Sequence, residues 1–132
     1  MTKKRKFKKE YGKELLRIAE GDLESAKGLH KIKVGRTENV LFLAEQAIEK
    51  ALKAVLCWRE IPTPIVHDLG IILENFPEPI VVPDAENMLD LGQFATIRRY
   101  EEGVAQFTTE EIADVIALAE KTVLWASRQI SK

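Results

Sequence analysis

Apolar side chains recur at helical spacing through most of this chain, and most regularly between Asn39 and Trp58. One side of that stretch carries apolar residues at the i, i+3/i+4, i+7 spacing of a buried stripe. A second row consists of alanines, whose small side chains let a neighbouring backbone approach closely. The stripe comprises Leu41, Ala44, Ile48, Ala51, Leu52 and Val55, and the alanine row comprises Ala44, Ala47, Ala51 and Ala54. The pattern predicts a central helix that the rest of the chain surrounds.

Polar residues of the same stretch gather in a row formed by Gln46, Glu49, Lys50 and Lys53. Glu49 precedes Lys53 by four positions, which is the spacing of a favourable ion pair along a helix. On the residues alone, the row is typical of a solvated helix face.

A long helix is predicted before the central one and another after it. The first runs from about Lys9 to Lys31, and its glycines Gly21 and Gly28 are interpreted as places of close contact with the alanine row. The last carries a regular apolar stripe from Ile112 onwards.

Four residues are expected to cap helices in this chain, and one of them, Asp84, is the predicted N-cap of the helix over residues 85–100. Thr37 is the predicted N-cap of the central helix, because it follows a turn and precedes the apolar stripe. Thr108 stands three residues before Glu111, as in a capping box that starts the last helix. Asp68 is the predicted N-cap of a short helix in the middle connection.

The middle connection begins with Pro62 and Pro64, which cannot continue a helix. A short helix over residues 69–75 and a longer one over residues 85–100 are expected after them. No stretch shows the alternation of a β-strand. The sequence therefore predicts an all-α protein, an up-and-down bundle of four principal helices with a short extra helix.

Charge is distributed unevenly along the 132 residues, which are enough for a single domain. Residues 3–9 carry six positive charges and no negative one, whereas the later residues hold 14 Lys and Arg against 21 Asp and Glu. We interpret residues 1–9 as a basic, flexible, solubilising tail and residues 10–132 as one helical domain. The alternative is an electrostatic arm for nucleic acid; RNA is a candidate partner for which the sequence offers no further support.

The chain has a single cysteine, Cys57, and no apolar run of the length that crosses a membrane. The basic start is not followed by the apolar region of a signal peptide. These features predict a soluble, cytoplasmic protein that does not bind membranes. Cys57 is interpreted as a small packed residue rather than a catalytic thiol.

Sequence motifs for nucleotide loops, metal sites and redox centres are missing. His30 and His67 are the only histidines, so a His-rich metal site is not available. We expect neither a metal nor a cofactor.

Arg98, Arg99 and Tyr100 form a block with two interpretations. Paired guanidinium groups can bind phosphate in bidentate fashion, and a tyrosine can stack on a base. Alternatively, the two arginines balance the negative end of a helix dipole and Tyr100 packs at the edge of the core. The residues alone do not decide between these interpretations.

His67 and Asp68 follow the two prolines. His67 could bind phosphate or transfer a proton. Without further context, the pair is more typical of a helix start.

These pieces, in this order, resemble the HEPN domain. The resemblance rests on AEQAIEKALKAVL at residues 44–56, the His-Asp-Leu at 67–69, the Arg-Arg-Tyr block at 98–100 and an amphipathic last helix that ends with Val123-Leu124-Trp125. It covers about residues 10–130 and is strongest for small stand-alone HEPN proteins that accompany minimal nucleotidyltransferases. It implies a fold like that of nucleotidyltransferase substrate-binding proteins, often as a homodimer.

The resemblance also implies a function, which is nucleotide binding, with ATP as one candidate, or substrate binding for a separate nucleotidyltransferase in a toxin–antitoxin-like pair. Other HEPN branches are metal-independent ribonucleases, marked by an Arg followed after four to six residues by a His. This spacing is missing here, and Glu101 stands where the family's RYP-like block has proline. A non-catalytic binding role is therefore favoured over a ribonuclease toxin or a purely structural dimer. The expected nucleotide-binding residues are Arg98, Arg99, Tyr100, His67, Gln46, Glu49, Lys50 and Lys53.

Overall fold

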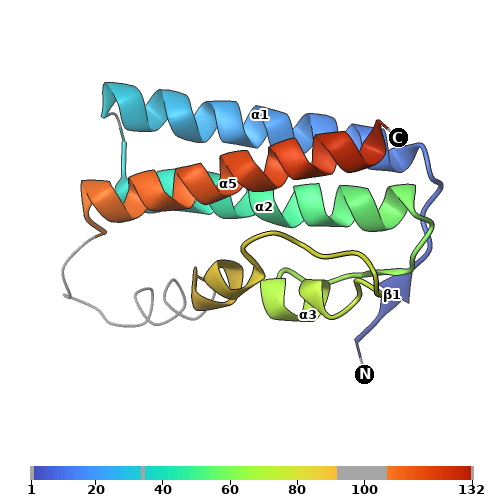
Figure 1. Ribbon diagram of the computed structural model, residues 1–132. Helices are drawn as coiled ribbons and strands as arrows, with labels where there is room; N and C mark the ends of the chain where they lie inside the picture. Colours follow the sequence, from blue (N-terminus) through green and yellow to red (C-terminus); the bar gives the residue numbers. More distant parts are fainter. Residues whose placement is uncertain (1, 34, 92–106, 132) are drawn as a thin grey trace.

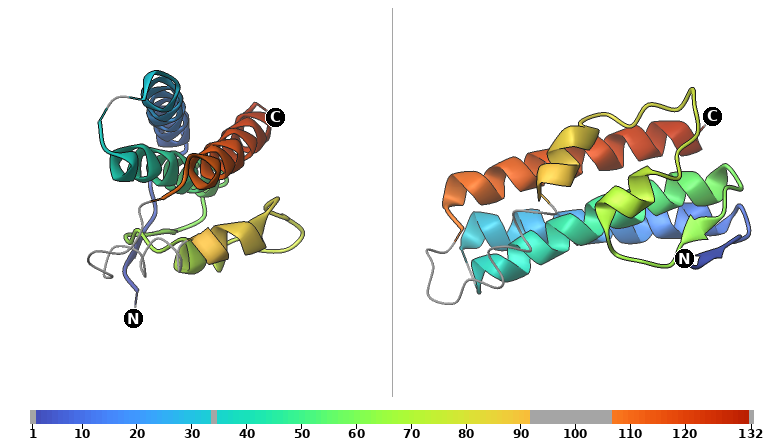
Figure 2. Two further views of the ribbon diagram at one scale, coloured as in Figure 1. Left: turned by 90° about the vertical axis from the view of Figure 1, so that its left-hand side faces the viewer. Right: turned by 90° about the horizontal axis from the view of Figure 1, so that it is seen from below.

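Three long helices, α1 (Tyr11–Ile32), α2 (Thr37–Trp58) and α5 (Thr109–Ile130), lie side by side and form the body of the molecule (Figure 1). The computed structural model describes residues 2–33, 35–91 and 107–131. Seen along the helices, α1, α2 and α5 occupy the corners of a triangle, with shorter segments beneath them (Figure 2). The prediction of an all-α helical bundle is confirmed.

The central position of α2 follows from its sequence. Its apolar stripe is inaccessible, with Leu41 exposed by 1% and Ile48 and Leu52 by 0%. All four residues of the alanine row are buried as well. Because α2 contacts both α1 and α5 along its length, it is the helix around which the core forms.

The backbones of α1 and α2 come close together at Gly12, at the start of α1. A Cβ atom on Gly12 would lie 2.8 Å from the carbonyl oxygen of Ala54 and 3.1 Å from the backbone nitrogen of Trp58. A Cβ atom on Gly21 or Gly28 would have no neighbour within 4 Å. The expectation that Gly21 and Gly28 mediate the contact is wrong, because both lie on the solvent side of α1.

Of the four predicted N-caps, those at Thr108 and Asp68 are confirmed, and Asp84 directly precedes the helical residues 85–91. Thr108 Oγ1 accepts a hydrogen bond from the Glu111 amide at 3.0 Å, and the Thr108 amide donates to Glu111 Oε1 at 2.8 Å. Asp68 accepts from the Ile71 amide and starts α3 (Leu69–Leu73). Thr37 is instead the first residue of α2, and its hydroxyl lies 3.4 Å from the side chain of Glu38. The N-cap position belongs to Arg36, whose backbone is extended and whose side chain makes no capping bond.

The structure contains a short two-stranded antiparallel ladder that the sequence pattern does not predict. It joins the start of the chain to the segment that follows α2. β1 (Lys4–Arg5) pairs with β2 (Thr63–Pro64), with Lys4 opposite Pro64 and Arg5 opposite Thr63. The Ile65 amide extends the ladder by donating to the Lys3 carbonyl at 2.9 Å. Part of the basic segment thus has a defined place, while the boundary between tail and domain at residue 9 stays a prediction.

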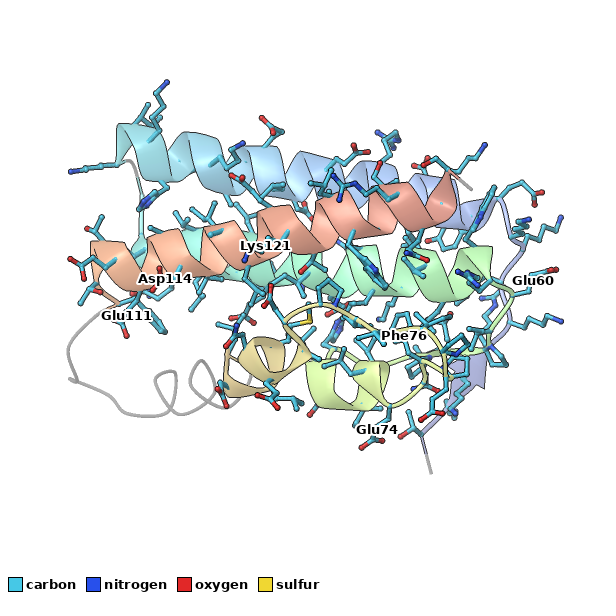
Figure 3. All side chains as sticks on the ribbon, viewed as in Figure 1. Glu60, Glu74, Phe76, Glu111, Asp114 and Lys121 are labelled. Atoms are coloured by element: carbon cyan, nitrogen blue, oxygen red, sulfur yellow. The ribbon has the colours of Figure 1, made fainter. Side chains whose placement is uncertain are left out.

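The segments beneath α2 close the core on that side (Figure 1). Phe76, just after α3, lies between α3 and the long helices (Figure 3), with its ring centroid 5.9 Å from that of Trp125 on α5. Residues 85–91 are helical and bury Met88; the rest of the helix predicted over residues 85–100 lies outside the described residues. No helix in the described ranges is long and apolar enough to span a bilayer.

Candidate functional site

Three side chains of the predicted polar site meet where α2 passes the segment after β2. Glu49 is buried, at 4% exposure, and its Oε2 atom accepts a hydrogen bond from Lys53 Nζ at 3.1 Å. The Nδ1 atom of His67 lies 3.0 Å from Oε1 and 3.1 Å from Oε2 of the same carboxylate. We call Glu49, Lys53 and His67 the Glu49 cluster.

The surrounding backbone holds His67 in this place. Lys53 Nζ also donates to the Val66 carbonyl at 2.7 Å, which fastens the residue before His67 to α2. On the other side, the capping bond of Asp68 fixes the start of α3. His67 therefore stands between two anchored residues, although it belongs to no helix or strand.

Of the two ring nitrogens of His67, Nδ1 contacts Glu49 and Nε2 lies on the side away from it. An ionised carboxylate only accepts hydrogen bonds, so Nδ1 carries the proton that points to Glu49. In the neutral ring, Nε2 is then an acceptor, and in the charged ring it is a donor. Because the His67 side chain is 83% exposed, a ligand can reach its outer edge. The arrangement can bind a polar group or accept a proton.

The residues of the polar row of α2 contact two different parts of the structure, α1 and the segment after β2. Lys50 turns towards α1, where its Nζ lies 2.9 Å from Asp22 Oδ2. Gln46 is half-buried, three residues before Glu49 on α2. The expectation of a solvated face is wrong, because α1 and the segment of residues 63–68 cover most of the row.

Of the eight predicted site residues, the structure brings together Glu49, Lys53 and His67 and places Lys50 in another ion pair. Arg98, Arg99 and Tyr100 lie outside the described residues, so their part in a site stays a prediction.

Sequence reasoning did not select Asp22 or the Val66 carbonyl as members of this polar network. Helical periodicity concerns residues of one helix, whereas Asp22 and Lys50 are 28 positions apart on two helices. Every residue has a backbone carbonyl group, so the residue type does not show which carbonyl accepts a side-chain hydrogen bond. Neither partner could have been found from the pattern of residue types.

The Glu49 cluster is poorly suited to a metal ion. It offers one carboxylate and one imidazole, and the ammonium of Lys53 already occupies the carboxylate. Throughout the part of the chain that the structure describes, no group of three His, Cys, Asp or Glu residues could hold a metal.

A separate cavity of about 160 Å³ lies where α1 leads into α2. It is lined by Leu29, His30, Lys33, Gly35, Thr37, Val40, Thr109 and Ile112. No residue of the Glu49 cluster lines it, so the two histidines serve different places in the fold.

The comparisons with known proteins identify a family and a shared fold. Residues 13–129 match the HEPN domain. The structure of TT1696 from Thermus thermophilus is similar, with a TM-score of 0.75 and 24% identity over 89% of this chain and 97% of that one. ST0689, an archaeal HEPN homologue, has a TM-score of 0.66 and 25% identity over 90% of this chain and 97% of its own. Comparison with curated proteins gives no significant match.

Proposed function

This chain belongs to the HEPN domain family, and from that premise we propose that it is a non-catalytic module that binds a nucleotide or presents a substrate. In this proposal it acts as a homodimer beside a separate minimal nucleotidyltransferase, in a toxin–antitoxin-like pair. The observation that carries the proposal is the Glu49 cluster, in which a buried carboxylate fixes an exposed imidazole next to an ammonium group.

Hydrogen-bond donors in the cluster suit a phosphate oxygen. The ammonium of Lys53 has three N–H donors, of which Glu49 and the Val66 carbonyl accept two. Among the described residues, no acceptor is recorded for the third. A protonated His67 adds its Nε2 donor at the exposed edge of the cluster, so the phosphate would be bound by two neighbouring charged donors.

The remaining contacts are assigned by the family resemblance. Arg98 and Arg99 would hold further phosphate oxygens, and Tyr100 would stack on the base. Gln46 and Lys50 would line the rest of the site, and Lys50 would do so from its ion pair with Asp22 of α1. ATP is the nucleotide to test first.

Calorimetric titration of ATP tests the proposal, and the second histidine provides a matched control. We expect His67→Ala to weaken ATP binding about tenfold, the loss of one charged hydrogen bond. We expect Arg99→Ala to weaken it as well, and His30→Ala to leave it unchanged. Equal heats for all variants, or no heat for any nucleotide, would exclude the nucleotide-binding role.

A second candidate is a ribonuclease toxin, and one observation favours it. A carboxylate that orients an imidazole through Nδ1 and leaves Nε2 exposed is the arrangement of a general base. An RNA-cleavage assay decides: an enzyme of this type would lose activity in both His67→Ala and Glu49→Gln. The absence of cleavage by the wild-type protein would remove this candidate.

Assembly is tested separately from nucleotide binding. We expect the purified protein to sediment as a dimer and to co-purify with a nucleotidyltransferase when both are expressed together. Co-purification without nucleotide affinity would favour a purely structural interaction role.

A further inference from the structure

The basic segment of residues 3–9 is fixed to the bundle through its backbone, and its charges stay in solvent. β1 is paired with β2, and the carbonyl of Lys8 accepts a hydrogen bond from Cys57 Sγ at 3.1 Å. All six Lys and Arg side chains of the segment are exposed. The structure therefore holds a row of cations at a defined place on the molecule.

Aromatic rings hold several of these cations in position. The guanidinium of Arg5 lies 5.1 Å from the centroid of Phe7, whose ring stacks on Tyr11 at 5.3 Å. The ammonium groups of Lys9 and Lys13 lie 4.4 Å and 5.3 Å from the centroid of Trp58.

Cation–π contacts are attractive, and side chains that are already ordered lose less entropy when they bind a ligand. We call the whole set the basic end surface. It consists of Lys3, Lys4, Arg5, Lys6, Lys8, Lys9 and Lys13 with the rings of Phe7, Tyr11 and Trp58.

Glu10 follows Lys9 directly and Glu60 lies at the same end of the molecule (Figure 3), but no carboxylate of the described residues forms an ion pair with the cations of this surface. None of the seven takes part in an ion pair there. Glu14, the acidic residue next to Lys13, is already bound by Arg17.

The far end of the molecule carries charges of both signs, because the last turn of α1 brings Lys31 and Lys33 there beside the start of α5. Glu111 and Asp114 mark the acidic start of α5, opposite the end that carries β1 (Figure 3). A polyanion would therefore be drawn more strongly to the basic end surface, where seven cations lie close together, than to the mixed charges of the far end.

We propose that the basic end surface binds single-stranded nucleic acid through its phosphate backbone. From β1 the chain passes across the end of the bundle to the start of α1 (Figure 1). The cations along it therefore lie on a bent path and not in one plane. A flexible strand of phosphates can follow that path, whereas a flat bilayer would meet only part of it. Tyr11, 41% exposed, offers a ring on which an unpaired base can stack, which a base inside a duplex cannot do.

This surface uses no residue of the Glu49 cluster. The proposal of nucleic-acid binding at the bundle end can therefore be wrong while that of nucleotide binding at His67 is right, and the reverse. The variant His67→Ala distinguishes the two proposals, because it should leave nucleic-acid binding unchanged.

Salt-dependent binding of labelled oligouridylate and oligothymidylate tests the proposal. If about six phosphates are contacted, the logarithm of the affinity should fall with the logarithm of salt with a slope of about −4. The triple variant Lys4→Gln, Lys6→Gln, Lys8→Gln should flatten that slope by about 2 and weaken binding about a hundredfold at low salt. A matched triple variant at the other end of α1, Lys27→Gln, Lys31→Gln, Lys33→Gln, should retain both values. Glutamine keeps the backbone bonds of β1, and circular dichroism checks the helical content of both proteins.

A second measurement locates the contact. The chain has two tryptophans, so Trp125→Phe leaves Trp58 as the sole reporter beneath Lys9 and Lys13. Its fluorescence should change on addition of either oligonucleotide.

Four outcomes would overturn the proposal. These are equal loss of binding in both triple variants, absence of binding to either oligonucleotide, equal or tighter binding of a duplex, and preference for vesicles that contain phosphatidylserine. Unchanged Trp58 fluorescence in the presence of bound oligonucleotide would also contradict it.

Discussion

Glu49 shows how burial decides the role of a charged residue. Its carboxylate is 4% exposed and is bonded by Lys53 and His67, so its charge is held by protein groups in place of water. The carboxylate of Glu14 also has a cationic partner on its own helix, Arg17, but both side chains are largely in solvent. Solvent screening makes exposed pairs contribute little, whereas a buried charge that loses its partner is costly.

The first prediction uses this contrast. Glu49→Ala leaves the ammonium of Lys53, whose side chain is 15% exposed, with the Val66 carbonyl as its one acceptor among the residues that the structure describes. We expect the free energy of unfolding to fall by about 3 kcal/mol, measured by urea denaturation followed by circular dichroism. Glu14→Ala is the control and should unfold at a midpoint close to that of the wild type. Equal shifts in the two variants would show that Glu49 is an ordinary surface charge.

The second prediction concerns Cys57, whose pKa is raised by burial. The thiol should stay protonated at neutral pH, so alkylation by iodoacetamide should be far slower in the native protein than in urea. Because the folded state holds this proton more tightly than the unfolded state, Cys57 should lower stability as the pH rises above about 8.5. Cys57→Ala should remove that part of the pH dependence. Rapid alkylation of the native protein would contradict the assignment.

At the level of single residues, the sequence singled out Glu49, Lys53 and His67 but did not show how their side chains pair. Glu49 and Lys53 lie four positions apart on one helix, so their contact follows from helical geometry. His67 is 18 positions from Glu49. Its place beside Glu49 follows from the turn after α2, the β1–β2 ladder and the N-cap at Asp68. Charged residues at helical spacing look the same in sequence whether water or a neighbouring segment covers them.

Among the elements, the contact between α1 and α2 gives the third prediction. Gly12→Ala would place a methyl group 2.8 Å from the Ala54 carbonyl oxygen, which forces the helices apart. Such overpacking should destabilise the protein by about 1–3 kcal/mol. Gly21→Ala and Gly28→Ala meet no neighbour and should stabilise it by about 1 kcal/mol through helix propensity. The melting temperatures of the three variants distinguish these cases. A change of melting temperature with the same sign in all three would show that Gly12 is not the site of close helix packing.

The fourth prediction compares two threonines at helix starts. Thr108 caps α5 with both bonds of a capping box, so Thr108→Ala should cost about 1 kcal/mol. Thr37 is inside the first turn of α2 and makes no capping bond, so Thr37→Ala should cost clearly less. Urea denaturation of the two proteins provides the measurement. A larger loss for Thr37→Ala would mean that Thr37 does stabilise the start of α2 as a cap does.

The long helices could be predicted from the sequence because each has a regular apolar stripe, although only α5 has a clear start signal, its capping box. The β1–β2 ladder could not, because two-residue strands such as Lys4–Arg5 and Thr63–Pro64 have no room for an alternating pattern. The role of Gly12 was also hidden. Close packing at a glycine depends on the neighbouring helix, and Gly21 and Gly28 look equally suitable in sequence.

Across the whole molecule, α2 connects features that lie far apart in the chain. Its C-terminal end carries Cys57 and Trp58, which contact Lys8 and Lys9. Its middle carries the Glu49 cluster, which holds Val66 and His67 just after β2. Because β1 pairs with β2, the basic segment and the loop that carries His67 are joined through one backbone ladder and rest on one helix.

This connection yields the fifth prediction, which separates the backbone of the basic segment from its charges. Deletion of residues 2–6 removes β1 and the bond from the Ile65 amide to the Lys3 carbonyl, so that amide should exchange with solvent faster. Since Val66 and His67 follow directly, the ring of His67 should leave Glu49 part of the time, and its NMR signals should move towards those of a free histidine. The variant Lys4→Gln, Arg5→Gln keeps the ladder and should leave the signals where they are. If the deletion does not move them, the bond from Lys53 to the Val66 carbonyl and the cap at Asp68 hold His67 without the ladder.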